Sequence, residues 1–161
     1  MGERINFNKL REIRQNHNSI AFCSGCYDLL HSGQVYFFKQ CKEYADVLVV
    51  SVGSDLVIKQ LKGENRPIIS EENRLYCVSS IQNVDYAILG DKKVLPGKID
   101  FEDIIKELKP DVFILNDDDS GLSEKKKLCD ELGIKLELVK RILPDGLTKL
   151  STSDIIKRIN G

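Results

Sequence analysis

The apolar run at residues 46–52, with the sequence DVLVVSV, limits the possible folds more than any other stretch of this chain. A strand with one face in water alternates apolar and polar residues, whereas this run is apolar on both sides. Strands buried on both faces are typical of parallel sheets that helices cover from both sides. The run therefore predicts an α/β fold.

Strand-like and helical segments alternate along the rest of the chain. The other strand-like segments lie at residues 19–24, 85–89, 111–115 and 134–139. Helical patterns lie at residues 6–15, 33–44, 56–61 and 123–132, and after the capping residues Ser70, Asp100 and either Ser151 or Thr152. In the last helix we expect Ile155, Ile156 and Ile159 to pack inward. The alternation predicts a single Rossmann-like, doubly wound, five-stranded parallel sheet.

The length of 161 residues suits one domain, and the chain has no internal repeat or long linker. Residues 1–18 precede the first predicted strand and are expected to form an N-terminal helical extension. A loop containing Pro96 and Gly97 is expected after the third strand. We therefore expect one domain over residues 1–161.

Composition argues against several classes of partner. The net charge of −1 gives no general attraction to nucleic acid or to a membrane surface. No apolar run approaches the roughly 20 residues of a membrane span, and the N-terminus has no apolar signal segment. The five cysteines are odd in number and scattered, which is typical of reduced thiols. These features predict a cytoplasmic protein without nucleic-acid or membrane partners.

The stretch from Ala21 to Gln34, AFCSGCYDLLHSGQ, joins the first predicted strand to the next helix. Gly25 allows the backbone to turn, and the helix opens at His31-Ser32-Gly33-Gln34. Unpaired N–H groups and the helix dipole then point at one spot, which is a natural phosphate site. His31 lies beside that spot and can supply a further donor.

These residues resemble the signature G-x-F-D-x-x-H-x-G-H of the cytidylyltransferase-like nucleotidyltransferases. Such enzymes join a nucleoside triphosphate to a phosphate ester and release pyrophosphate. LKGENRP at residues 61–67 and LSTSDII at residues 150–156 resemble motifs of the heptose-phosphate adenylyltransferases in that superfamily. The glycerol-phosphate cytidylyltransferases are the next most similar group. The resemblance extends from about Ser19 to Ile159 and implies one nucleotidyltransferase domain.

The resemblance also implies a role for each matching residue. His31, Gln34 and Lys62 would be catalytic, with His31 on the phosphates and Lys62 over the triphosphate or the acceptor phosphate. The nucleotide-binding residues would be Cys26, Tyr27, Asp28, Gly33, Asp55, Arg74, Asn116, Asp117, Ser151, Thr152 and Ser153. Mg²⁺ would arrive with the triphosphate, and no side chain of the protein is assigned as a metal ligand.

Three features leave alternatives open. Asp28 can contact the nucleotide, support the site, or cap the turn with its carboxylate. The run Asp117-Asp118-Asp119 can hold a cation or line the nucleotide pocket, where Asn116 replaces a frequent glycine. Cys23-x-x-Cys26 suggests a redox or zinc site, but no second pair of ligands completes one.

Gln34 departs from the signature, whose second histidine it replaces. Glutamine keeps an N–H donor at similar reach but loses the positive charge. The enzyme could use Gln34 as a neutral donor, could be a relative that binds without turnover, or could be a constructed variant.

The residues and the resemblance together predict a nucleotidyltransferase that activates a sugar-phosphate or polyol-phosphate, with ATP favoured slightly over CTP. Surface polysaccharide synthesis is the expected setting, and a homodimer is possible. The alternative, from another functional class, is a nucleotide-binding module without turnover.

Overall fold

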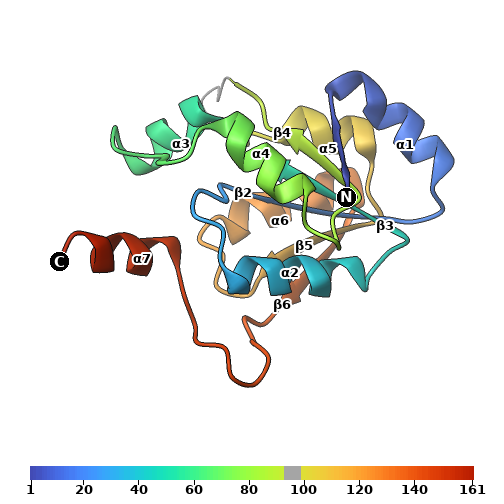
Figure 1. The fold of residues 1–161 in the computed structure, drawn as a ribbon. Helices are drawn as coiled ribbons and strands as arrows, with labels where there is room; N and C mark the ends of the chain where they lie inside the picture. Colours follow the sequence, from blue (N-terminus) through green and yellow to red (C-terminus); the bar gives the residue numbers. More distant parts are fainter. Residues whose placement is uncertain (93–98) are drawn as a thin grey trace.

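The computed structural model describes residues 1–92 and 99–161, which form one parallel sheet with helices on both faces (Figure 1). The strand order is β1-β4-β3-β2-β5-β6, and every neighbouring pair is parallel. The strands are β1 (Glu3–Ile5), β2 (Ile20–Gly25), β3 (Val47–Val52), β4 (Tyr86–Leu89), β5 (Val112–Asn116) and β6 (Lys135–Val139). The predicted doubly wound α/β fold is confirmed, while the expected loop at Pro96 and Gly97 lies outside the described residues.

The sheet has one strand more than the five that we expected. The additional strand, β1, pairs with β4 at the edge of the sheet, where Glu3 lies opposite Tyr86. Only Ile5 of its three residues is buried, so β1 carries no apolar run that could reveal it. Residues 1–18, expected to be a helical extension, thus supply an edge strand before η1 (Phe7–Lys9) and α1 (Leu10–Asn16).

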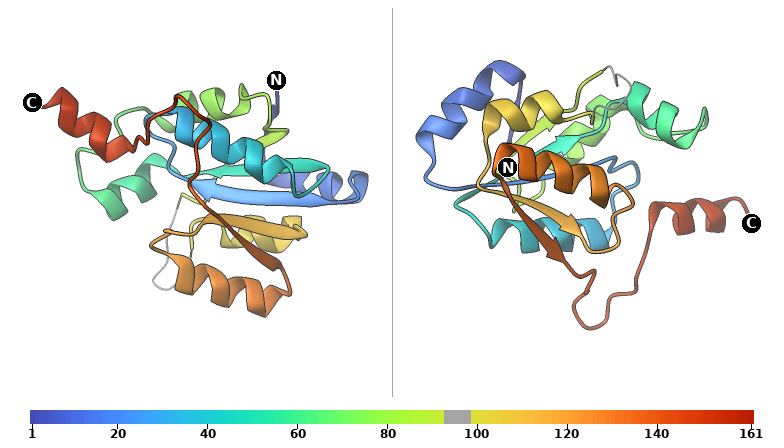
Figure 2. Two further views of the ribbon diagram at one scale, coloured as in Figure 1. Left: turned by 90° about the horizontal axis from the view of Figure 1, so that it is seen from below. Right: turned by 180° about the vertical axis from the view of Figure 1, so that it is seen from behind.

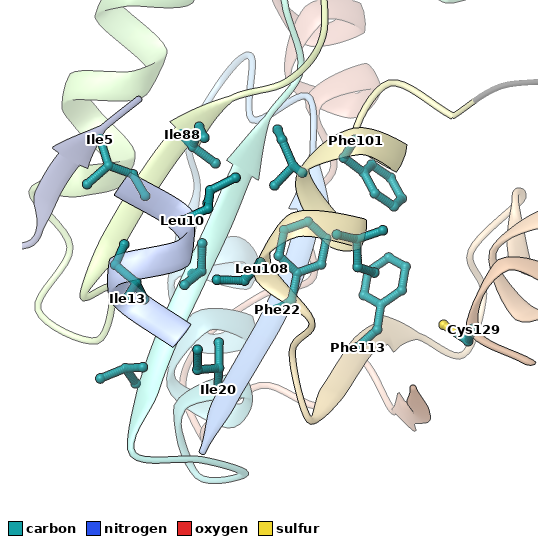
Figure 3. Packing of buried hydrophobic residues seen from close by; sticks show 14 of the residues in the cluster. Ile5, Leu10, Ile13, Ile20, Phe22, Ile88, Phe101, Leu108, Phe113 and Cys129 are labelled. Carbon is teal, nitrogen blue, oxygen red and sulfur yellow. The ribbon is translucent and has the colours of Figure 1, made fainter. Parts of the chain in front are cut away.

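Helices cover both faces of the sheet (Figure 2). Alternating side chains of the strands build a separate core on each face. Phe22 of β2 lies in the first core, between α1, α5 (Glu102–Leu108) and α6 (Leu122–Leu132). Its ring packs at 5.2 Å from the ring of Phe113 and 5.5 Å from that of Phe101 (Figure 3). The neighbouring Ala21 and Cys23 lie in the second core, under α2 (Ser32–Lys42) and α4 (Glu71–Ser79).

The last helix, α7 (Thr152–Ile159), stands apart from the sheet at the end of a long arm (Figure 1). None of its residues is buried, and Ile159 is 73% exposed. The expectation that Ile155, Ile156 and Ile159 pack inward is therefore wrong, because these side chains are not part of the core. The reason is the arm at residues 140–151, which carries the helix beyond the edge of the sheet.

Two other helix starts differ in detail from the prediction. The N-cap of α5 is Phe101, not Asp100. Ser70 is the N-cap of α4, as predicted, but its hydroxyl accepts from the Asn73 side chain at 2.8 Å instead of capping a backbone N–H. None of the helices in the described ranges is long and apolar enough to cross a membrane.

The position of β2 in the sheet determines where a ligand can bind. The chain passes from β2 to β3 on one side and later returns to β5 on the other side. The strand order therefore reverses between β2 and β5, and ligands of doubly wound sheets bind at the carboxyl ends of the strands beside such a reversal. Gly25 ends β2 at this edge, and Asn116 ends β5.

Candidate active site

The turn after β2 is held by close packing of Tyr27 on Gly25. A Cβ atom on Gly25 would lie 2.8 Å from Cζ of Tyr27, so only glycine fits there. The Tyr27 backbone has a φ of 50°, and its buried ring packs on Phe38 with the centroids 5.0 Å apart. Because the ring belongs to the core, Tyr27 can offer a ligand only its backbone. The predicted contact of Tyr27 with the nucleotide stays a prediction, limited to its backbone groups.

Gln34 is built into the start of α2. The backbone N–H of His31 donates to Oε1 of Gln34 at 3.2 Å, and the backbone N–H of Gln34 donates to the carbonyl of His31 at 3.0 Å. The first bond is the half of a capping box that the N3 side chain makes, and the second is a backbone bond of the first turn. These bonds leave the NH₂ of the Gln34 side chain unused, so it can donate to a ligand.

The His31 imidazole lies over Gly33 at the N-terminus of α2. A Cβ atom on Gly33 would meet Cε1 and Nδ1 of the ring at 3.1 Å. Nδ1 is buried and lacks a hydrogen-bond partner among residues 1–92 and 99–161. Burial lowers the pKa of His31, and the positive charge of Arg141 lowers it further, so the ring is neutral at pH 7. Buried polar atoms of native proteins normally have a hydrogen-bond partner, so an unpartnered ring nitrogen is consistent with a ligand contact.

Arg141 is a site residue that our sequence reasoning missed. It follows β6 closely and donates from Nε to Oδ1 of Asp118 at 2.8 Å. Its positive charge helps to lower the pKa of His31. Its place after the last strand could have identified it, because ligands of doubly wound sheets bind at the carboxyl ends of the strands.

The aspartate run after β5 is largely engaged within the protein. Asp118 pairs with Arg141, and Asp119 accepts from Lys125 at 2.9 Å with both oxygens. The described part of the chain contains no cluster of three or more His, Cys, Asp or Glu side chains that could hold a metal ion. All five cysteines are free thiols. A cation held by the aspartate run is therefore not supported.

Lys62 acts on the signature turn through its charge. It is the last residue of α3 (Asp55–Lys62) and is exposed. Burial raises the pKa of the Cys26 thiol, and the charges of Lys62, Arg74 and Arg66 oppose this rise. The Lys62 charge therefore acts on the turn that the signature builds, and its contact with the phosphates stays a prediction.

Arg74 and Asp55 form part of the frame of the site. The Arg74 guanidinium is 1% exposed and donates to the carbonyl of Ile69 at 2.8 Å, the carbonyl of Cys26 at 2.6 Å and Oδ1 of Asp55 at 2.7 Å. All three of its nitrogens are thus engaged within the protein. The predicted contacts of Arg74 and Asp55 with the nucleotide stay predictions, and the geometry gives both residues a supporting role.

The start of α7 lies next to the start of α2. The carbonyl of Leu150 would be 3.9 Å from a Cβ atom on Gly33. Ser151 caps α7, because its Oγ accepts from the Asp154 backbone N–H at 3.1 Å. Ser32 and Thr152 therefore lie at the same edge of the sheet, as expected, and two helix N-termini converge beside His31. Contacts of Cys26, Asn116, Asp117, Thr152 and Ser153 with a nucleotide stay predictions.

Two curated proteins with similar sequences carry the same name. The chain is 34% identical over 140 residues to "Bifunctional protein HldE" of Aliarcobacter butzleri (strain RM4018), an alignment that covers 87% of this chain and 26% of that protein. It is also 34% identical over 150 residues to the protein of the same name from Helicobacter pylori (strain J99 / ATCC 700824), covering 93% and 29%. The chain thus spans less than a third of the length of these curated relatives.

Solved structures show the same fold. A lipopolysaccharide core biosynthesis protein from Thermoplasma volcanium GSS1 superposes with a TM-score of 0.63 at 30% identity, covering 79% of this chain and 98% of that chain. A pantoate-beta-alanine ligase from Francisella tularensis has a TM-score of 0.62 at 16% identity, covering 99% and 77%. The second likeness concerns the fold alone.

The sequence model of the family described as "Cytidylyltransferase-like" matches residues 22–158, which include both converging helix starts, Lys62 and Arg141. With this match over most of its length, the chain belongs to the cytidylyltransferase-like family.

Proposed function

We propose that the chain transfers a nucleotidyl group from a nucleoside triphosphate to a sugar-phosphate or polyol-phosphate and releases pyrophosphate. The observation that carries the proposal is the convergence of the α2 and α7 N-termini beside the unpartnered Nδ1 of His31. N–H groups and two helix dipoles lie together there, with the Arg141 charge acting on His31 and the Lys62 charge acting on Cys26 of the adjoining turn, and such a set of groups suits a triphosphate.

The reaction needs no nucleophile from the protein. An oxygen of the acceptor phosphate forms a bond to the α-phosphorus, the bond to the bridging oxygen of the β-phosphate breaks, and the electron pair leaves with pyrophosphate. The protein aligns two anions and stabilises the charge that grows on the α-phosphoryl oxygens. In this proposal His31 and the NH₂ of Gln34 donate from one side, and Lys62 approaches from the other.

Mg²⁺ is the implied cofactor, and the residues fit an ion that arrives with the nucleotide. Asp28 and Asp55 are bound to Arg66 and Arg74, and no metal cluster exists in the described part of the chain. The ion would then be held mainly by the phosphates and water, which is common for Mg²⁺ in sites that handle nucleotides. It would supply neutralisation of the phosphate charge.

ATP as the preferred triphosphate and a heptose-type phosphate as the acceptor class are the finer part of the proposal. They are supported by LKGENRP, which resembles the heptose-type motif. The name of the Thermoplasma volcanium protein, a lipopolysaccharide core biosynthesis protein, supports a setting in surface polysaccharide synthesis. The homodimer expected from the resemblance stays a prediction that sedimentation velocity can test.

The test is pyrophosphate release with a panel of sugar-phosphates and polyol-phosphates, each combined with Mg²⁺ and either ATP or CTP. We expect turnover with at least one sugar-phosphate and a faster rate with ATP. A His31→Asn variant serves as the control for catalysis at this site. If no acceptor is turned over while ATP still binds, the catalytic proposal fails and the nucleotide-binding module takes its place.

A further inference from the structure

The loop that follows Lys62 has little of its own to hold it in place. Residues 61–65 are exposed, and Gly63 has a φ of 97° with no atom within 4 Å of where a Cβ would lie. A single backbone bond, from Arg66 N–H to the Gly63 carbonyl at 3.0 Å, closes the turn. Lys62 itself ends α3, whereas the path of the loop that leaves it depends on what the far end of the loop binds.

The far end of the loop binds the signature turn through a buried carboxylate. The Asp28 side chain is completely buried and accepts from three donors of the loop. Arg66 Nε donates to Oδ2 at 2.6 Å, and the backbone N–H groups of Ile68 and Ile69 donate to Oδ1 at 2.8 and 2.9 Å. Burial tends to raise the pKa of Asp28, but these three hydrogen bonds outweigh it and lower the pKa, so the carboxylate stays charged.

Arg74 fastens the same segment from its other side. It donates to the carbonyl of Ile69 and to the carbonyl of Cys26, one residue of the loop and one of the turn. Ile69 is thus held through its N–H by Asp28 and through its carbonyl by Arg74. Residues 66–69 and 26–28 therefore form one rigid unit.

We propose that Arg66 and Asp28 are positioning residues, which hold the loop on the signature turn so that Lys62 faces the phosphates. We call the contact of Asp28 with Arg66, Ile68 and Ile69 the Asp28 clasp. The inference rests on the proposed function for the role of Lys62, whereas the clasp itself needs no substrate. In this inference the Arg66 charge stabilises the structure of the site and does not bind substrate, because its partner is a buried carboxylate of this chain.

The first experiment measures amide hydrogen exchange at Ile68 and Ile69 in the full chain without ligand. Arg66→Met should speed exchange at both amides by about 10-fold or more, because a loosened clasp opens more often. Glu64→Gln is the matched control, since it breaks only the exposed pair with Lys59 in the same loop. Arg66→Lys keeps the positive charge but not the planar set of guanidinium donors, so its exchange rates should lie between those of Arg66→Met and Glu64→Gln. Unchanged exchange in Arg66→Met would overturn the clasp.

The second experiment is a double-mutant cycle on ATP affinity, with Lys62→Ala as the other change. If Arg66 acts through Lys62, Arg66→Met should weaken ATP binding by about 10-fold in the wild-type background and by less than about 2-fold when Lys62 is absent. Additive effects would mean that Arg66 contacts the phosphates itself and would overturn the positioning role. A wild-type chain that binds no ATP would refute the proposed function, while the exchange measurement would still decide the clasp.

Discussion

At the residue scale, His31 is the side chain whose state a bound nucleotide should change most. In the free protein burial and the charge of Arg141 hold its pKa below the ordinary value of about 6.5. A triphosphate would bring several negative charges to the ring and would offset Arg141. The protonated form of His31 is therefore disfavoured before binding and favoured after it.

We predict that ATP binding takes up a proton at His31 near pH 6. Because the complex holds more protons than the free protein, affinity should rise as the pH falls from 7 to 6. Calorimetry in two buffers of different ionisation enthalpy measures the uptake. His31→Asn should retain only the proton uptake of the nucleotide itself, and an equal uptake in both proteins would contradict the prediction.

Gln34 is the second residue whose replacement is informative. Its Oε1 is engaged with the His31 backbone, so the start of α2 is adapted to glutamine. We predict that Gln34→His changes pyrophosphate release by less than about 10-fold. Gln34→Ala should release pyrophosphate more slowly by a factor on the order of 10²–10³, because the amide donor is lost. It should also lower the unfolding free energy by about 0.5–1.5 kcal/mol, because one hydrogen bond is lost.

A rise of 10²–10³ in Gln34→His, the order expected for one donor, would instead identify the wild-type chain as an enzyme slowed by a missing charge. The measurement is turnover of the three proteins with one acceptor, Mg²⁺ and ATP.

At the scale of elements, helix α3 presents Lys62 at its C-terminal end, away from the core. We predict that Lys62→Ala shifts the unfolding free energy by no more than about 0.5 kcal/mol, as for other exposed side chains. Its turnover should fall on the order of 10²–10³, because a charged donor to the phosphates is lost. Lys59→Ala, on the same helix and paired with Glu64, is the control that should leave turnover unchanged. Unaltered kinetics in Lys62→Ala would remove this residue from the site.

At the scale of the whole molecule, α7 belongs to the site and not to the core. None of its residues is buried, yet its N-terminus lies beside Gly33. We predict that deleting residues 152–161 lowers the melting temperature by no more than about 2 °C. ATP binding should weaken by about 10-fold, the order expected for one helix dipole in a favourable position.

Deletion of residues 158–161 alone is the matched control, because it leaves the N-terminus of α7 in place. Thermal unfolding and an ATP titration of both truncated proteins check this prediction. A full deletion that unfolds the chain would show that α7 stabilises the sheet after all.

The sequence by itself determined five of the six strands, the burial of the central ones and the glycine turn after β2. Those features are local: apolar runs specify strands, glycines specify turns, and the signature residues lie within fourteen positions of one another. A cap at Ser151 or Thr152 was likewise predicted from a short motif, and Ser151 is the N-cap of α7. Strand β1 was missed because three residues with one buried side chain carry no periodic signal.

Only the tertiary structure decided which side chains meet across the site. Arg141 lies 110 positions after His31 in the chain, and nothing local links the two residues. Arg74 and Asp28 have charges that suggest a ligand, but the folded chain buries both and engages them with its own groups. The isoleucines of α7 form an apolar pattern that suggested a core helix, yet the arm before them keeps the helix off the sheet. Periodicity reports which face of an element is apolar, whereas the sheet order and the path of the loops determine what that face meets.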